Sequence, residues 1–379
     1  MDIKIDSEKE QKSITSLLES RSDVEADRMK RFLKMPDLSR TPGSPIYELA
    51  ERIINLPDFK SFDVVQVPEI VPAAQSFDLF NFPADHPARS TSDTYYVDKE
   101  YILRPHTTIS WYYYLISEHA KEKVRQNVPL GVLTYGKVYR KDEIDRHHMN
   151  VFHQMDGYYL IPKDQKTITV DDLKNILLKI AQAVFGGDVK YRFNEDTFPY
   201  THPSIEMEVD KNGSWVEVLG SGVVKGSVLE KLGVDSSNYT GWAFGFGLER
   251  LAIVSMELPD IRLLWSEDER VKKQLKLGNI YKEVSKYPPI TRDISFVVSN
   301  DFVPNNYFDL IRDIGGNIVE EVEQIDKYED PEKFGSDTSS YTYRIVYRST
   351  DRTLKSEEVD AIQDEIYRQT ASQFKARLR

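Results

Sequence analysis

The chain has 379 residues, of which 40% are hydrophobic and 30% charged, as in an ordinary globular protein. It contains no cysteine, which excludes disulfides, thiolate metal sites and cysteine nucleophiles. The net charge of −12 has the wrong sign for a protein that coats nucleic acid through a broad basic surface, so a nucleic-acid partner would need local basic patches. No apolar run approaches the roughly 18–20 residues of a membrane helix, and we expect no membrane contact.

The first 44 residues are expected to form an N-terminal extension. Residues 1–35 mix acidic and basic side chains and predict a charged helical segment, with Ile14, Leu17 and Leu18 on one face. Three prolines and a glycine between residues 36 and 45 predict a loop. An organellar presequence is rich in Arg and Ser and poor in acids, so this segment does not match one.

A larger domain is expected over residues 45–284. Apolar residues at helical spacing predict a helix over 46–54, and a short strand follows at 62–67. Further helices are predicted at 170–185 and 248–258. Strands are predicted at 94–97, 101–103, 131–139, 155–161, 189–193, 205–209 and 215–219. Consecutive strands joined by short turns favour an antiparallel sheet over a Rossmann repeat, so we predict an α+β fold with helices flanking that sheet.

The order of predicted elements changes near residues 286–289, which contain two prolines. Beyond them we expect a strand, a helix, two strands and a helix, at 293–298, 305–314, 318–328, 340–348 and 356–374. This is the βαββαβ order of a ferredoxin-like domain, with its last strand in the short tail. We therefore predict a separate domain over residues 285–379, with residues 285–289 as its hinge.

A first candidate nucleotide site lies where a predicted strand ends and a charged loop follows. The strand runs into Arg140, a polar loop leads to His148, and the chain returns through Phe152. A guanidinium fixed at a strand end can hold a phosphate bidentately, while Phe152 offers a face on which a purine stacks. Taken alone, an ordinary hairpin with a charged loop is an open alternative.

A second candidate is the run 241–251, in which three glycines alternate with aromatic residues before a predicted helix. Glycines let a ligand approach the strand closely, and Arg250 in the first helical turn would supply a second cation for ATP. Taken alone, a core strand followed by a surface arginine explains this segment better.

Together the two segments resemble motifs 2 and 3 of class II aminoacyl-tRNA synthetases. Further segments, residues 85–89, 103–108, 152–157, 198–204 and 215–222, are similar to those of phenylalanyl-tRNA synthetases. The segment 286–296 resembles the start of the ferredoxin-fold anticodon-binding domain. Its fusion behind the catalytic domain is the arrangement of the single-chain mitochondrial enzymes, and the resemblance covers roughly residues 45–379.

The resemblance implies ATP and Mg²⁺ as cofactors, and phenylalanine and tRNA(Phe) as substrates, with transfer to the 2′-hydroxyl of the terminal adenosine. Arg140 and Arg250 are the implied catalytic residues. The implied ATP ligands are Arg140, Asp142, His148, Phe152 and Arg250. The implied phenylalanine ligands are His106, Thr108, Gln154, Asp156, Phe198, Tyr200 and Ala243. Glu217 is a candidate Mg²⁺ ligand, and scattered basic residues of the C-terminal domain, such as Arg344, Arg348 and Arg352, are expected to contact tRNA.

Four residues depart from the family pattern. Asp142 and Asp156 stand where glutamate is common, and a carboxylate one methylene shorter needs a shift or a bridging water to keep its contact. Trp111 stands where many members have glutamine, and Thr108 stands for serine. The aromatic run 112–114 is expected to serve packing rather than stacking on a ligand.

Two alternative functions are open at this stage. One is a class II synthetase for another amino acid, against which segment 198–200 and the C-terminal domain argue. The other is a catalytically silent relative that only binds tRNA or a protein, against which the presence of Arg140, Gln154, Glu217 and Arg250 argues. The single-chain arrangement implies a monomer that serves protein synthesis in the mitochondrial matrix, with another organelle such as a plastid left open.

Overall fold

The computed structural model describes residues 1–5, 8–284, 287–349 and 351–379. They divide into two compact units. The first comprises Met1–Arg140, Val151–Leu258 and Leu275–Ile280, and the second comprises Lys141–Asn150, Pro259–Gln274 and Tyr281–Arg379. Of the expected hinge at 285–289, residues 285 and 286 lie outside the described residues.

The N-terminal extension contributes a strand as well as helices to the first unit. β1 (Asp2–Lys4) pairs in parallel with β2 (Asp63–Gln66), and the sequence did not predict it because three residues are too few to show a period. α1 (Glu8–Ser20) and α2 (Val24–Lys34) follow as expected. Ile14 and Leu18 are buried, whereas Leu17 is exposed.

An eight-stranded sheet forms the centre of the first unit, in the order β1-β2-β5-β6-β10-β9-β8-β7. Its other strands are β5 (Leu130–Tyr139), β6 (Val151–Pro162), β7 (Tyr191–Asp196), β8 (Thr201–Lys211), β9 (Ser214–Val224) and β10 (Tyr239–Gly247). Apart from the parallel pairs β1–β2 and β2–β5, the neighbours are antiparallel. The predicted α+β fold is confirmed.

Two short strands form a second, smaller sheet in this unit. β3 (Ile70–Pro72) pairs with β4 (Tyr101–Leu103). The strand predicted at 94–97 is wrong, since among these residues only Tyr96 forms an isolated bridge, to Ile102. Four residues with apolar character are a weak signal, and a turn-rich loop occupies this stretch instead.

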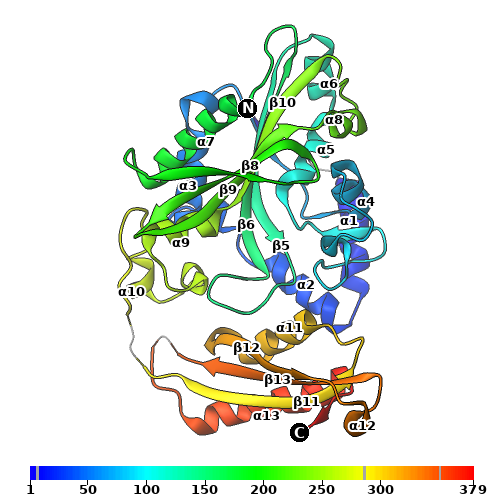
Figure 1. The fold of residues 1–379 in the computed structure, drawn as a ribbon, viewed down its shortest axis with the longest axis vertical. Coiled ribbons are helices and arrows are strands. Elements are labelled where there is room, and N and C mark those ends of the chain that lie inside the picture. The colour runs from blue at the N-terminus through cyan, green and yellow to red at the C-terminus, as the bar shows by residue number, and fades with distance from the viewer. Residues whose placement is uncertain (6–7, 285–286, 350) are drawn as a thin grey trace. The chain divides into compact units, whose positions relative to one another are not determined.

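Helices cover both faces of the large sheet. α3 (Pro45–Ile54), α7 (Val170–Phe185) and α9 (Leu248–Met256) lie together on one side (Figure 1). α4 (Ala73–Phe77), α5 (Ser110–Leu115), α6 (Glu118–Arg125) and α8 (Gly226–Lys231) lie on the other (Figure 1). Trp111, Tyr113 and Tyr114 of α5 are buried in an apolar core with Tyr158 and Ala243, so this run packs the interior. Within the described ranges, no helix combines the length and apolarity needed to cross a lipid bilayer.

The second unit is built on a four-stranded sheet in the order β12-β13-β11-β14. Its strands are β11 (Ile290–Ser299), β12 (Val319–Tyr328), β13 (Thr338–Tyr347) and β14 (Arg377–Leu378). The long helices α11 (Pro304–Gly315) and α13 (Ser356–Phe374) pack on it, and α10 (Glu269–Lys272) and α12 (Pro331–Phe334) are short. Phe296, Tyr307 and Tyr343 centre its core. The predicted βαββαβ order is confirmed, with β14 as the last strand.

The loop 141–150 belongs to this second unit. Ile144 is buried in its core, and the amide of Val322 donates to the carbonyl oxygen of Ile144 at 3.2 Å. Arg312 donates to the carbonyl oxygen of Glu143 at 2.6 Å, and Asn150 donates to Asp309 at 3.0 Å.

Candidate active site

Three neighbouring strands organise the candidate site. β6 carries Phe152, Gln154 and Asp156 at alternate positions, so their side chains leave the same face of the sheet. On β10, Gly247 lies opposite Gln154 and Gly245 lies opposite Asp156. A Cβ on Gly245 would lie 3.3 Å from both Asp156 carboxylate oxygens, closer than most side chains tolerate. Glycine therefore keeps space open around this carboxylate.

Asp156 is the centre of a buried polar cluster. The hydroxyls of Thr107 and Thr108 both donate to it, the latter at 2.9 Å, and the Thr107 amide donates to Gln154 Oε1 at 3.2 Å. Burial raises the pKa of Asp156 to about 6, although the two threonine hydroxyls and Arg140 oppose that change. Three predicted ligands of the substrate's polar end thus meet here.

His106, the fourth predicted residue of this end, has one ring nitrogen occupied and one without a partner. Its Nε2 lies 3.1 Å from the carbonyl oxygen of Ser76, while its buried Nδ1 has no hydrogen-bond partner among the described residues. Burial lowers the pKa of His106 to about 3, and Arg140 lowers it further, so the ring is neutral. Because a carbonyl accepts from Nε2, the lone pair on Nδ1 is left to accept a proton donor.

Aromatic rings gather next to this polar cluster. Phe198 stacks on Tyr200 with ring centres 6.0 Å apart, and Phe80 meets Tyr200 edge-on at 6.3 Å. A Cβ on Gly220 would lie 2.9 Å from the Phe198 ring, so only glycine leaves space for that ring. Ala243 is buried and lies opposite Tyr158 on β6, in the apolar core against which Tyr200 packs. The predicted phenylalanine ligands therefore lie together.

Two of the surrounding rings were not predicted. Phe82 stacks in parallel on His106 at 5.9 Å, and Phe80 packs edge-on against Trp111 at 5.6 Å. Both come from the segment 77–82, whose three phenylalanines precede the recognised segment 85–89. That clustering of aromatics was the available signal.

The two predicted catalytic arginines lie at the ends of their motifs. Arg140 donates through Nε to the carbonyl oxygen of Pro105 at 2.8 Å, and its guanidinium lies 5.2 Å from the ring centre of Phe152. Arg250, in the first turn of α9, donates to the carbonyl oxygen of Glu217 at 3.4 Å. Asp142 and His148, by contrast, lie on the loop 141–150 of the second unit, where His148 Nδ1 lies 2.8 Å from Asp145.

Glu217 has the environment of a carboxylate that would gain from a nearby cation. Burial raises its pKa, nearby Glu206, Asp196 and Glu208 raise it further, and Arg250 opposes them. In the described part of the chain, no three His, Asp or Glu side chains form a ready metal centre. Mg²⁺ commonly uses one or two protein carboxylates and completes its shell with water and phosphates, so this environment fits the ion.

The three arginines predicted to contact tRNA all have acidic partners in the second unit. Arg344 pairs with Asp293 at 2.8 Å, Arg348 with Glu320 at 2.9 Å, and Arg352 with Glu358 at 2.6 Å. These pairs were not predicted, because each partner lies on another strand or helix or several residues away.

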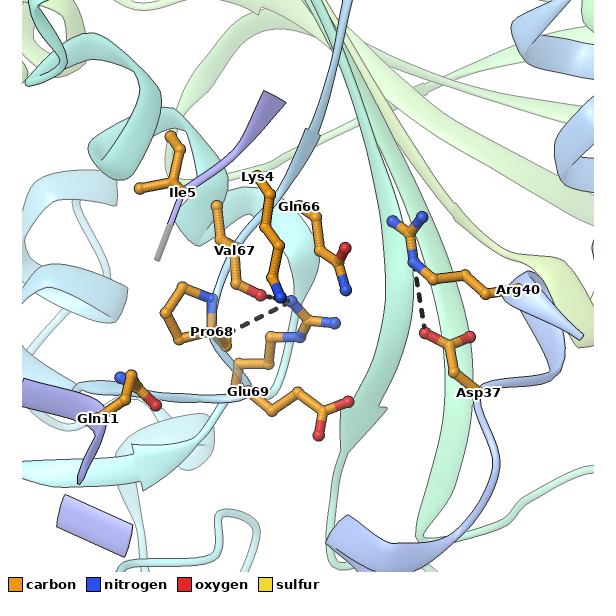
Figure 2. Close-up of a pocket in the computed structure, with 10 residues that line it drawn as sticks. Lys4, Ile5, Gln11, Asp37, Arg40, Gln66, Val67, Pro68 and Glu69 are labelled. Atoms are coloured by element: carbon orange, nitrogen blue, oxygen red, sulfur yellow. Dashed lines mark hydrogen bonds and ion pairs between the residues drawn. The ribbon is translucent and has the colours of Figure 1, made fainter. Parts of the chain in front are cut away.

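A cavity of about 210 Å³ lies elsewhere in the first unit (Figure 2). It is lined by Lys4, Ile5, Gln11, Asp37, Arg40, Gln66, Val67, Pro68, Glu69 and Arg104. None of these described lining residues was predicted to bind a substrate.

The fold and the two arginine motifs together define a class II aminoacyl-tRNA synthetase core joined to a ferredoxin-like domain. Residues 33–275 match the tRNA synthetases class II core domain (F), and residues 285–379 match the ferredoxin-fold anticodon binding domain. Curated relatives are more specific. The chain is 40% identical over 321 residues to the chloroplastic/mitochondrial phenylalanine–tRNA ligase of Arabidopsis thaliana, covering 82% of this chain and 71% of the relative.

Two mitochondrial phenylalanine–tRNA ligases are similar over comparable lengths. The enzyme of Mus musculus is 37% identical, covering 80% of this chain and 72% of the relative. That of Saccharomyces cerevisiae is 32% identical, covering 89% and 87%. This chain belongs to the phenylalanine–tRNA ligase family of aminoacyl-tRNA ligases.

Proposed function

We propose that this protein activates phenylalanine with ATP and transfers it to tRNA(Phe) for protein synthesis in an organelle. The observation that carries the proposal is the convergence of an acceptor-rich polar cluster, Asp156 with His106, and an aromatic pocket at Phe198 and Tyr200. The names of the relatives support an organelle, and within it we propose the mitochondrial matrix and a monomer.

The polar cluster suits the ammonium and carboxylate of an amino acid. Asp156 supplies a buried negative charge, and Nδ1 of His106 supplies an acceptor that lacks a donor. Thr108 and Gln154 complete the set of ligands. A buried acceptor without a donor costs free energy in the empty protein, and an ammonium group would remove that cost.

The reaction needs no nucleophile from the protein. The substrate carboxylate attacks the α-phosphate of ATP and pyrophosphate leaves, so the protein positions the reactants and neutralises charge. Arg140 and Arg250 would bind phosphates, and Phe152 would stack on the adenine. Asp142 and His148 are proposed as further ATP ligands. Glu217 would hold Mg²⁺, which supplies charge neutralisation at the phosphates.

Selection against tyrosine is proposed to depend on Ala243. Tyrosine differs from phenylalanine by one hydroxyl, and an apolar pocket rejects an added hydroxyl by only about 100-fold. Ala243 would close the pocket at the para position and offer the hydroxyl no hydrogen-bond partner, so that burying it is costly. Phe198 and Tyr200 would contact the substrate ring edge-on.

For the whole chain we propose three functional parts: an extension at 1–44, a catalytic domain at 45–284 and an anticodon-binding domain at 285–379. The match of residues 285–379 to an anticodon-binding domain supports the last of these. Arg344, Arg348 and Arg352 are proposed to meet tRNA phosphates by exchanging their present carboxylate partners for them.

ATP–pyrophosphate exchange with the purified protein and each of the twenty amino acids tests the assignment. Exchange stimulated chiefly by phenylalanine is the expected result. Exchange with another amino acid would keep the class and overturn the substrate, while no exchange with any of them would favour a silent relative.

A further inference from the structure

His153 lies between two predicted ligands on β6 but points to the other side of the sheet. Phe152 and Gln154 flank it in sequence, and alternation along the strand sends its ring away from theirs. The side chain is fully buried. A buried imidazole must find partners for its nitrogens, and here both nitrogens have them.

The first partner is Glu249, which directly precedes Arg250. The His153 amide donates to both carboxylate oxygens of Glu249, at 2.9 and 2.8 Å, and Nδ1 lies 2.6 Å from Oε1. Glu249 is itself buried, and it lies in the first turn of α9, where the helix dipole favours a negative charge. One carboxylate thus links the start of β6 to the start of α9.

The second partner fixes which ring nitrogen faces Glu249 as a donor. The amide of Leu38 donates to Nε2 of His153 at 2.9 Å. A backbone N–H can only donate, so Nε2 must present its lone pair and Nδ1 must carry the proton. Leu38 is the first residue of a 3₁₀ turn, Leu38–Arg40, that Asp37 caps by accepting from the Ser39 amide at 3.0 Å.

Asp37 connects this network to the cavity in Figure 2. One of its oxygens lies 3.4 Å from His153 Nε2, and another lies 3.7 Å from Nε of Arg40. Figure 2 shows Asp37 and Arg40 facing each other at one side of the cavity. The network therefore begins at a solvent-filled space and ends one residue before Arg250.

We propose that His153 and Glu249 are positioning residues that hold Phe152 and Arg250 at a fixed separation for ATP, and that the turn at Asp37–Leu38 sets the proton on His153 that this contact requires. The inference rests on the proposed roles of Phe152 and Arg250. Neither His153 nor Glu249 touches the substrates; they act through their chain neighbours.

Two substitutions of His153 separate its two nitrogens. In His153→Asn, the side-chain amide stands where Nδ1 stood and can still donate to Glu249, but the Leu38 amide loses its acceptor. In His153→Gln, the amide oxygen reaches the place of Nε2 and accepts from Leu38, but Glu249 loses its ring donor. Both variants lose the ring and a similar amount of packing, so each is a matched control for the other.

The experiment measures ATP affinity by calorimetry, together with KM and kcat in pyrophosphate exchange and the melting temperature of each variant. His153→Gln is expected to weaken ATP binding about tenfold, because one hydrogen bond to a buried charge is lost. His153→Asn is expected to stay within about threefold of the parent. The KM for phenylalanine is expected to change little in both, since its polar ligands lie on the opposite face of β6.

Equal ATP affinities in the two variants would overturn the inference, as would losses that follow melting temperature rather than the Glu249 contact. Its failure is distinguishable from failure of the proposed function. A parent protein that binds ATP without phenylalanine-dependent exchange contradicts the substrate assignment, while the calorimetric comparison still decides the role of His153. A parent protein that does not bind ATP contradicts both.

Discussion

The polar end of the phenylalanine pocket and the arginines of the C-terminal unit handle charge in opposite ways. In the pocket, Asp156 is fully buried without a cationic partner, and His106 keeps one acceptor without a donor. In the C-terminal unit, Arg344 and Arg352 are exposed and already paired with acids. The small substrate therefore meets groups that gain a partner, whereas tRNA must displace partners that are present. Amino-acid binding should depend strongly on single groups, and tRNA binding weakly on any one of them.

The largest expected effect is at Asp156. Asp156→Asn keeps the size of the side chain but removes the charge that would pair with the substrate's ammonium. Losing one partner of a buried charge pair costs about 2–5 kcal/mol, so KM for phenylalanine should rise on the order of 100-fold. KM for ATP should hardly change. Pyrophosphate exchange measures both constants, and a parallel rise in both would show general damage to the site.

Ala243→Gly should have the next largest effect. Removing the methyl group opens the proposed para position, and para-chlorophenylalanine should gain about 30-fold in kcat/KM relative to phenylalanine, within the range for one methylene-sized change in an apolar pocket. Ala181→Gly, equally buried but in α7, controls for the loss of stability that a new glycine causes. Unchanged selectivity would remove Ala243 from the pocket.

The raised pKa of Asp156, about 6, predicts a pH dependence of phenylalanine binding. Above that value the carboxyl is ionised and can pair with the ammonium; below it the bound proton must leave first. KM for phenylalanine should therefore rise about tenfold for each pH unit below 6, while ATP binding changes less. Asp156→Asn should abolish the dependence. A flat profile in the parent protein would mean that the carboxyl is ionised throughout.

The sequence predicted elements where local signals agreed and lost contacts that join distant residues. Helix 170–185 matched α7 at both ends because its periodicity is strong and Thr169 and Asp172 form a capping box. The residues of the pocket came from recognised segments. The network of His153 could not be predicted, since Glu249 is 96 residues away and Leu38 is 115 residues away. The partners of Arg344 and Arg348 were lost for the same reason.

The smallest expected effects test the other side of the comparison, the paired arginines. Arg344 donates two hydrogen bonds to Asp293, at 2.9 and 2.8 Å, on the neighbouring strand β11. If Arg344 meets a tRNA phosphate, Arg344→Ala should raise KM for tRNA about threefold, because an exposed ion pair is worth only about 0.2–1 kcal/mol and salt screens it. Asp293→Ala should act in the opposite direction and lower KM for tRNA about twofold, since it frees the guanidinium.

Opposite signs for these two variants distinguish an RNA contact from a structural ion pair. A pair that only stabilises the sheet would weaken in both variants and lower the melting temperature in both, without separating their values of KM for tRNA. Aminoacylation measured at low and moderate salt supplies the second criterion. The difference between the variants should shrink as salt rises, because both the ion pair and the phosphate contact are screened.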